Sequence, residues 1–139
     1  MEYELRDHTA DVAVAATGDT LEAVFAAVAD GLAAASCDDV PVDVGDRFTV
    51  SVTAESREAL LFDFLDELIY LRDVREALPV DHRVETIDEL GSEGWRLEAS
   101  AREVPLDEVD AREVKAVTYS EMRLEQTDEG WESYVVFDV

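Results

Sequence analysis

Two segments of the chain repeat apolar residues at the spacing of an amphipathic α-helix. The first follows a Gly-Asp turn and carries the apolar residues Leu21, Val24, Phe25, Val28 and Leu32. The second carries the apolar residues Leu61, Phe64, Leu65, Leu68 and Leu71. Steps of three and four residues place each set on one face of a helix. We predict a first helix that opens with a capping box at residues 19–22 and ends near Ser36, and a second that Ser56 caps and that ends before Pro79.

Other segments alternate apolar and polar residues, as half-buried strands do. The segments with this pattern are residues 2–6, 12–17, 47–54, 83–87, 95–101, 114–125 and 131–139. The last two are expected to pair as a hairpin, and residues 104–114 are expected to connect strands with at most one helical turn. Because most strands follow the helices along the chain, we expect an α+β fold. The prediction is a single compact domain over residues 1–139, with a mixed or antiparallel sheet and two main helices packed on one face.

The chain is strongly acidic. Its 35 aspartates and glutamates outnumber 11 lysines and arginines, so the net charge is −24. A hydrophobic content of 47% is too high for a disordered acidic chain, so a folded core is expected. Carboxylates repel phosphate groups, which excludes direct binding of nucleic acid and of anionic membranes as expected activities.

Concentrated salt explains this charge best. At about 1 M ionic strength the Debye length falls to roughly 3 Å, so surface carboxylates hardly repel one another. We interpret the chain as a halophilic, cytoplasmic protein in which most acidic residues maintain solubility. A single cysteine, Cys37, excludes an intrachain disulfide, and no signal peptide or apolar run of membrane-spanning length is visible.

The chain end is a first candidate site. Asp138 lies beside the free carboxylate of Val139, at the end of a predicted strand. Hard cations such as Ca²⁺ and Mg²⁺ prefer clusters of carboxylate oxygens of this kind. The alternative is that Asp138 is only the polar position of an edge strand.

Two further features contain candidate site residues. In the sequence DHTAD, Asp7 and Asp11 flank His8, which we interpret as an orienting group rather than a metal ligand. Short polar side chains also stabilise turns, so a structural role for this motif is the alternative. Lys115 is the only lysine in the chain, and its compact ammonium group suggests a specific use. A chance survivor of lysine loss is the alternative there.

Common catalytic motifs are absent from the sequence. It contains no glycine-rich nucleotide-binding loop, no CxxC pair and no GxSxG motif. The acidic residues Asp63, Asp66 and Glu67 on the second predicted helix are an alternative cation site, although a solvated acidic face is the favoured explanation for them. From the residues alone, a stand-alone metal-dependent phosphoester hydrolase therefore stays open.

Five motifs together resemble the archease family. They are DHTADV, GDTLEAVFAAVADGL, LLFDFLDELIYL, VKAVTYSEM and the terminal GWESYVVFDV. They occur in the family's order from the first strand to the last residue, and residues 80–113 contribute least. Where the family often has histidine after the TY pair, this chain has Ser120.

The resemblance implies a function that composition does not show. Archeases are accessory proteins of the RtcB-type, GTP-dependent RNA ligase in tRNA splicing, and they promote its guanylylation and multiple turnover without being enzymes. The resemblance implies that Asp11, Asp138 and Val139 bind a divalent cation, calcium first and Mg²⁺ or Mn²⁺ as alternatives. It also implies that activation requires Asp11, Lys115 and Asp138. A chaperone-like protein-binding role, a description attached to this family by analogy, is the further alternative.

Overall fold

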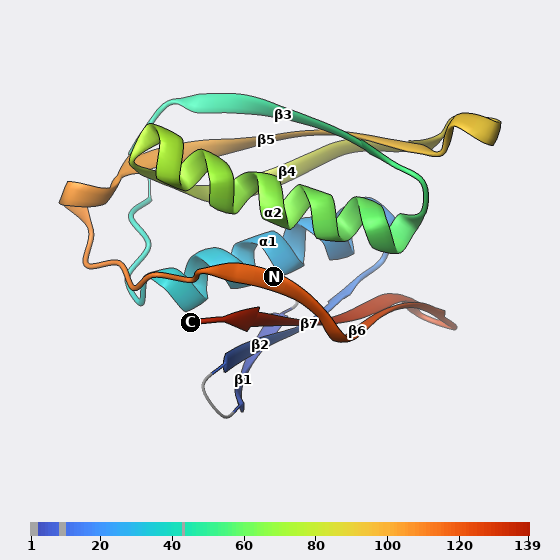
Figure 1. The fold of residues 1–139 in the computed structure, drawn as a ribbon, viewed down its shortest axis with the longest axis horizontal. Helices are drawn as coiled ribbons and strands as arrows, with labels where there is room; N and C mark the ends of the chain where they lie inside the picture. Colours follow the sequence, from blue (N-terminus) through green and yellow to red (C-terminus); the bar gives the residue numbers. More distant parts are fainter. Residues whose placement is uncertain (1–2, 9–10, 43) are drawn as a thin grey trace.

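The fold has three layers, with two helices between two antiparallel sheets (Figure 1). The computed structural model describes residues 3–8, 11–42 and 44–139. The four-stranded sheet has the order β1-β2-β7-β6 and the three-stranded sheet the order β3-β5-β4. The elements are β1 (Tyr3–His8), β2 (Asp11–Gly18), α1 (Leu21–Ser36), β3 (Arg47–Ala54), α2 (Arg57–Arg75), β4 (Ala77–Glu89), the 3₁₀ turn η1 (Gly91–Glu93), β5 (Trp95–Pro105), the 3₁₀ turn η2 (Leu106–Glu108), β6 (Ala116–Thr127) and β7 (Gly130–Asp138).

The predicted α+β class with two main helices is confirmed. The strands form two sheets, and each sheet has the helices against one of its faces. Helix α1 contacts strands of both sheets, and for this reason it is buried on more than the predicted stripe. Its additional buried residues are small: Ala27, Ala29, Gly31, Ala33, Ala35 and Ser36. A Cβ at Gly31 would collide with the side chain of Val14 in β2, so glycine permits this close approach.

The start of α1 differs from the prediction by one residue. Thr20, not Asp19, is the N-cap, and its hydroxyl accepts a hydrogen bond from the backbone N–H of Ala23 at 3.0 Å. The carboxylate of Glu22 accepts from the backbone N–H of Ile87 in β4 at 3.3 Å. Glu22 therefore joins the helix to a sheet, a use that a local capping motif does not reveal.

Helix α2 begins at its predicted cap and ends before Pro79 as predicted, but its buried face differs from the prediction. Ser56 accepts from the N–H of Ala59 at 3.1 Å, as predicted. Leu71, predicted to be in the buried stripe, is half-buried, whereas Arg72 is buried. Arg72 lies one turn after Leu68, so it continues the buried face of the helix.

The last two strands form the predicted hairpin, although β6 begins later than expected and β7 begins one residue earlier, at Gly130. Strand β6 begins at Ala116 rather than Val114, and residues 110–115 have no regular structure. The pairing with β7 is interrupted between Thr118 and Arg123 by an irregularity in which Glu121 has a positive φ of 59°. This bulge brings Tyr119 out of the regular ladder.

Three arginines surround Asp81 at a register shift in β4. Arg47 Nη2 lies 2.6 Å, Arg102 Nε 3.2 Å and Arg83 Nη2 3.9 Å from the Asp81 carboxylate. Partial burial alone would raise the pKa of Asp81, but the Arg102 hydrogen bond and the three positive charges together lower it below its ordinary value of 3.8. The lowered pKa means that the ionised form stabilises the fold.

We expect Asp81→Asn to remove one part of the acid sensitivity of the fold. A lowered folded-state pKa contributes stability above the unfolded pKa and loses it as the pH falls through the folded value. Because the Asp81 side chain is 42% exposed, the variant should lose no more than about 1 kcal/mol near neutral pH and nothing where the carboxyl is protonated. Asparagine also tolerates the positive φ of 50° at this position. Urea unfolding at several pH values tests this, and an unchanged pH profile would contradict it.

Candidate functional site

Strand pairing joins the two ends of the chain. Asp11, the first residue of β2, lies directly opposite Asp138, the last residue of β7. Residues directly opposite in an antiparallel pair point to the same face, with Cβ atoms about 4.5–5.5 Å apart. The next pair, Val12 and Phe137, points the other way, and Phe137 is completely buried toward the helices. The two aspartates are therefore on the outer face of the four-stranded sheet.

Lys115 lies beside this pair. Its backbone N–H donates to the carbonyl oxygen of Asp138 at 2.8 Å, and its neighbour Ala116 is opposite Asp138 in the sheet. Lys115 and the terminal residue Val139 are both exposed. We call Asp11, Lys115, Asp138 and Val139 the terminal cluster, because they are the residues to which the family resemblance pointed and the structure brings their backbones together. Asp7 and His8 lie in β1, but their side chains are outside the described residues.

The irregular segment 110–115, which we call the strap, leads into Lys115 and is fixed by arginines at two points. At its first half, the backbone N–H of Arg112 donates to Ser36 O at 2.6 Å. The Arg112 guanidinium donates to Ala35 O at 2.9 and 3.2 Å and forms a two-fold hydrogen bond with Asp38 at 3.0 and 3.1 Å. A cation that binds the last carbonyls of α1 also interacts favourably with the helix dipole.

The second half of the strap is held by Arg72 from α2. Its Nη1 donates to Val114 O at 2.7 Å, while Nε and Nη2 donate to Asp73 Oδ1 at 3.1 and 2.9 Å. Val114 is completely buried, so no water replaces this hydrogen bond. Arg72 thus fixes the carbonyl immediately before Lys115. The sequence analysis missed this role, although an arginine on the apolar face of a predicted helix was a usable signal.

The donor set of the terminal cluster fits a hard divalent cation. Two aspartate carboxylates on one face and a nearby chain-end carboxylate offer only oxygen ligands, the type that Ca²⁺, Mg²⁺ and Mn²⁺ prefer. Among the described side chains, those of residues 3–5, 11–42 and 44–139, no three of His, Cys, Asp or Glu are grouped to hold a metal ion. Asp63, Asp66 and Glu67 therefore do not form the alternative cation site.

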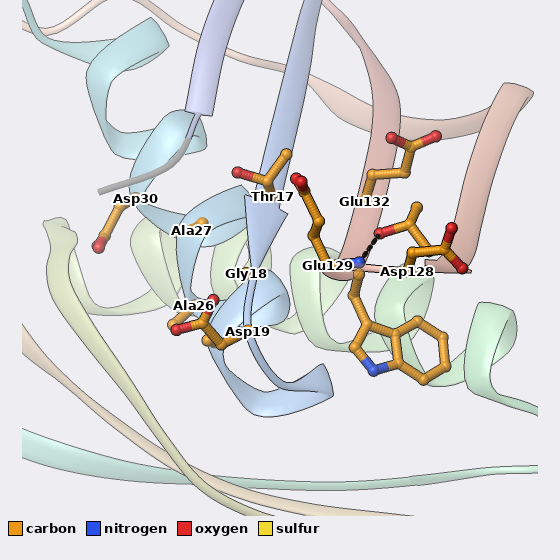
Figure 2. Close-up of a pocket in the computed structure, with 12 residues that line it drawn as sticks. Thr17, Gly18, Asp19, Ala26, Ala27, Asp30, Asp128, Glu129 and Glu132 are labelled. Atoms are coloured by element: carbon orange, nitrogen blue, oxygen red, sulfur yellow. Dashed lines mark hydrogen bonds between the residues drawn. The ribbon is translucent and has the colours of Figure 1, made fainter.

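A separate groove of about 890 Å³, which we call the acidic groove, lies at the other end of β2 (Figure 2). Its walls come from α1, the end of β2 and the turn between β6 and β7, and its acidic residues are Asp19, Asp30, Asp128, Glu129 and Glu132. Figure 2 shows that these carboxylates do not converge on one point. At about 3.3 Å per residue, the length of β2 separates this acidic groove from Asp11 by roughly 23 Å. It is not part of the terminal cluster.

The second histidine of the chain has a structural position. The His82 side chain is only 1% exposed, and its Nδ1 lies 2.8 Å from Asp30 Oδ1. The same carboxylate oxygen accepts from the backbone N–H of His82 at 3.0 Å. This pair connects β4 to α1 and does not face the terminal cluster.

Known proteins resemble this chain over almost its entire length. The model of the Archease protein family matches residues 3–139. A protein archease of Methanosarcina acetivorans is 37% identical over 99% of this chain and 95% of its own length, and one of Thermococcus gammatolerans is 39% identical over 99% and 98%.

Solved structures agree with these relatives. The solution structure of Methanobacterium thermoautotrophicum protein 1598 has a TM-score of 0.84 and 31% identity, with 99% of each chain covered. A Thermotoga maritima archease, described as a possible chaperone, has a TM-score of 0.64 at 22% identity, and the match covers 98% of this chain and 96% of that one.

Neither helix in the described part of the chain is both long and apolar enough to cross a membrane.

Proposed function

Because this chain belongs to the archease family, we propose that it activates a GTP-dependent RtcB-type RNA ligase of tRNA splicing and is not itself an enzyme. It promotes guanylylation of the ligase and allows repeated turnover. The observation that carries the proposal is the direct opposition of Asp11 and Asp138 with Lys115 beside them. Three residues from distant parts of the chain make a charged group where the central strands β2 and β7 meet at one end of the sheet, and a partner can reach it there.

The residues of the terminal cluster have different roles in this proposal. Asp11, Asp138 and the carboxylate of Val139 hold a divalent cation, Ca²⁺ or alternatively Mg²⁺ or Mn²⁺. When bound, such a cation supplies positive charge for phosphate oxygens. The ammonium group of Lys115 adds a second positive charge beside it, suited to the phosphates of a nucleotide in the ligase active site.

The charge of the whole chain favours a protein partner over RNA. A net charge of −24 repels a phosphate backbone, so the ligase rather than its tRNA substrate is the surface that this protein contacts. We also propose that the protein works in the cytoplasm at molar salt, where its carboxylates are screened.

Activation of the cognate ligase tests this function. We expect Asp138→Ala and Lys115→Ala each to reduce stimulated guanylylation in molar KCl by more than about tenfold, the usual effect of losing a charged group that stabilises a reacting phosphate. Asp128→Ala, an equal charge change in the acidic groove, should stimulate like the wild type. Full stimulation by both cluster variants would reject the assignment.

The hydrolase alternative makes the opposite prediction for the isolated protein. It requires phosphoester turnover without the ligase, whereas the accessory function requires none. Release of phosphate from a model phosphodiester by purified protein, abolished by Asp138→Ala, would favour hydrolysis.

A further inference from the structure

An aromatic pair lies on the surface that α2 and β6 share. Tyr119 stacks on Phe62 with ring centroids 4.1 Å apart and an interplanar angle of 4°. Phe62 is half-buried against the core, while Tyr119 is 55% exposed. One face of the tyrosine ring is therefore covered by Phe62, and the other faces outward.

Two acidic residues belong to the same segment as Phe62. Asp63 follows it directly in α2, and Glu55 precedes the Ser56 cap of that helix. Besides partial burial, the negative charges of Asp63 and Glu55 raise the pKa of Tyr119. Partial burial, then Asp66 and Glu55, raise the pKa of Asp63. Within the described part of the chain, no arginine or lysine forms an ion pair with Asp63. This group of like charges lacks a positive partner.

Other acidic residues of this protein have a positively charged partner. Arg112 lowers the pKa of Asp38, and Arg75 lowers that of Glu103. The protein also places arginines over half-buried aromatic rings: Arg123 lies 5.3 Å from the ring centre of Tyr134. In the described part of the chain, no arginine stacks on Tyr119, so its outer face is open to an arginine of another protein.

We propose that Tyr119, with Glu55 and Asp63, is a docking point for an arginine side chain of the partner ligase. A guanidinium group is planar, so it stacks on the ring while its N–H groups donate to the two carboxylates. Tyrosine and arginine are also the residues that contribute most to binding at protein interfaces. At molar salt only direct contacts of this kind keep their strength, since charges further apart are screened.

The position of Tyr119 connects this docking point with the terminal cluster. Lys115 lies four residues before Tyr119, directly ahead of β6, and α2 presents the exposed residues Tyr70 and Val74 along the same helix that carries Phe62. β6 begins beside the chain end, where Ala116 is opposite Asp138, and runs along α2 (Figure 1). At about 3.3 Å per residue, Tyr119 is within roughly 13 Å of Lys115, so one partner surface can contact both, and in this respect the inference rests on the proposed function.

Stimulation of ligase guanylylation, measured against the concentration of this protein, tests the docking point. We expect Tyr119→Leu to raise the concentration for half-maximal stimulation about tenfold and Tyr119→Phe to leave it within about twofold, because phenylalanine keeps the cation–π contact. Asp63→Lys should also raise it about tenfold. Glu132→Lys, the same charge change in the acidic groove, should not. Maximal stimulation should stay unchanged in all four variants, unlike in Asp138→Ala.

The outcomes separate the two proposals. If wild-type protein stimulates the ligase and Tyr119→Leu matches it, the docking point is wrong while the proposed function stands. Equal losses in Tyr119→Leu and Tyr119→Phe would also overturn the arginine contact, because the hydroxyl group would then be the contact. No stimulation by the wild type would reject the proposed function and, with it, the docking point. Thermal melting shows that each variant is folded before it is compared.

Discussion

Replacing Phe64 by alanine is expected to lower the free energy of unfolding by about 4 kcal/mol. Phe64 is completely buried in α2, and its ring lies 6.5 Å from that of Phe25 in α1, at an interplanar angle of 19°. Both helices lie between the sheets, so neither sheet can move inward to close the cavity without moving the other elements. The large residual cavity is the reason for an effect near the upper end of such substitutions.

Urea unfolding at constant KCl concentration measures this effect. Phe62→Ala is the matched control, because Phe62 belongs to the same helix but is only half-buried. The control should lose clearly less stability, as part of its surface is already exposed to water. Equal losses in the two variants would show that the middle layer is not closely packed around Phe64.

Replacing Arg72 by methionine is expected to cost about 3 kcal/mol and to release the strap before Lys115. Methionine keeps much of the volume of the arginine stem, but it cannot donate to Val114 O, which then stays buried without a partner. Loss of a charged hydrogen bond and an unsatisfied buried carbonyl each contribute roughly 1–3 kcal/mol. Asp73 is 64% exposed and returns to water at little cost.

Hydrogen exchange gives the local test of this prediction. The amide of Lys115 donates to Asp138 O, so its exchange should become much faster in Arg72→Met if the strap loosens. Arg75→Met is the control: Arg75 pairs with Glu103 at 2.6 Å but is 41% exposed, so this variant should lose clearly less stability than Arg72→Met. An unchanged Lys115 amide in Arg72→Met would mean that Arg72 stabilises the fold without positioning the site.

Local interactions explain which parts of the fold could be predicted. The helices follow from apolar residues three and four positions apart, and the Ser56 cap from a bond to Ala59 three residues later. The split into two sheets could not be predicted, because alternation along a strand shows that one face is buried but not which strand is its neighbour. The Glu22 bond to Ile87 is of the same kind, since it joins residues that only the folded chain brings together.

The amino-acid sequence by itself determined the two helices and most of the strands, since each depends on residue type and short spacing. It also offered separate candidate residues in DHTAD, at Lys115 and at the chain end, and the family resemblance combined them into one site. Only the tertiary structure decided that Asp11 faces Asp138, that Lys115 joins them, and that Arg72 and Arg112 fix the strap. Strand register is set by the burial of a whole sheet face, and the packing of α2 against the strap determines which carbonyl a buried arginine binds. Both depend on the assembled core, because they involve segments that are far apart in the sequence.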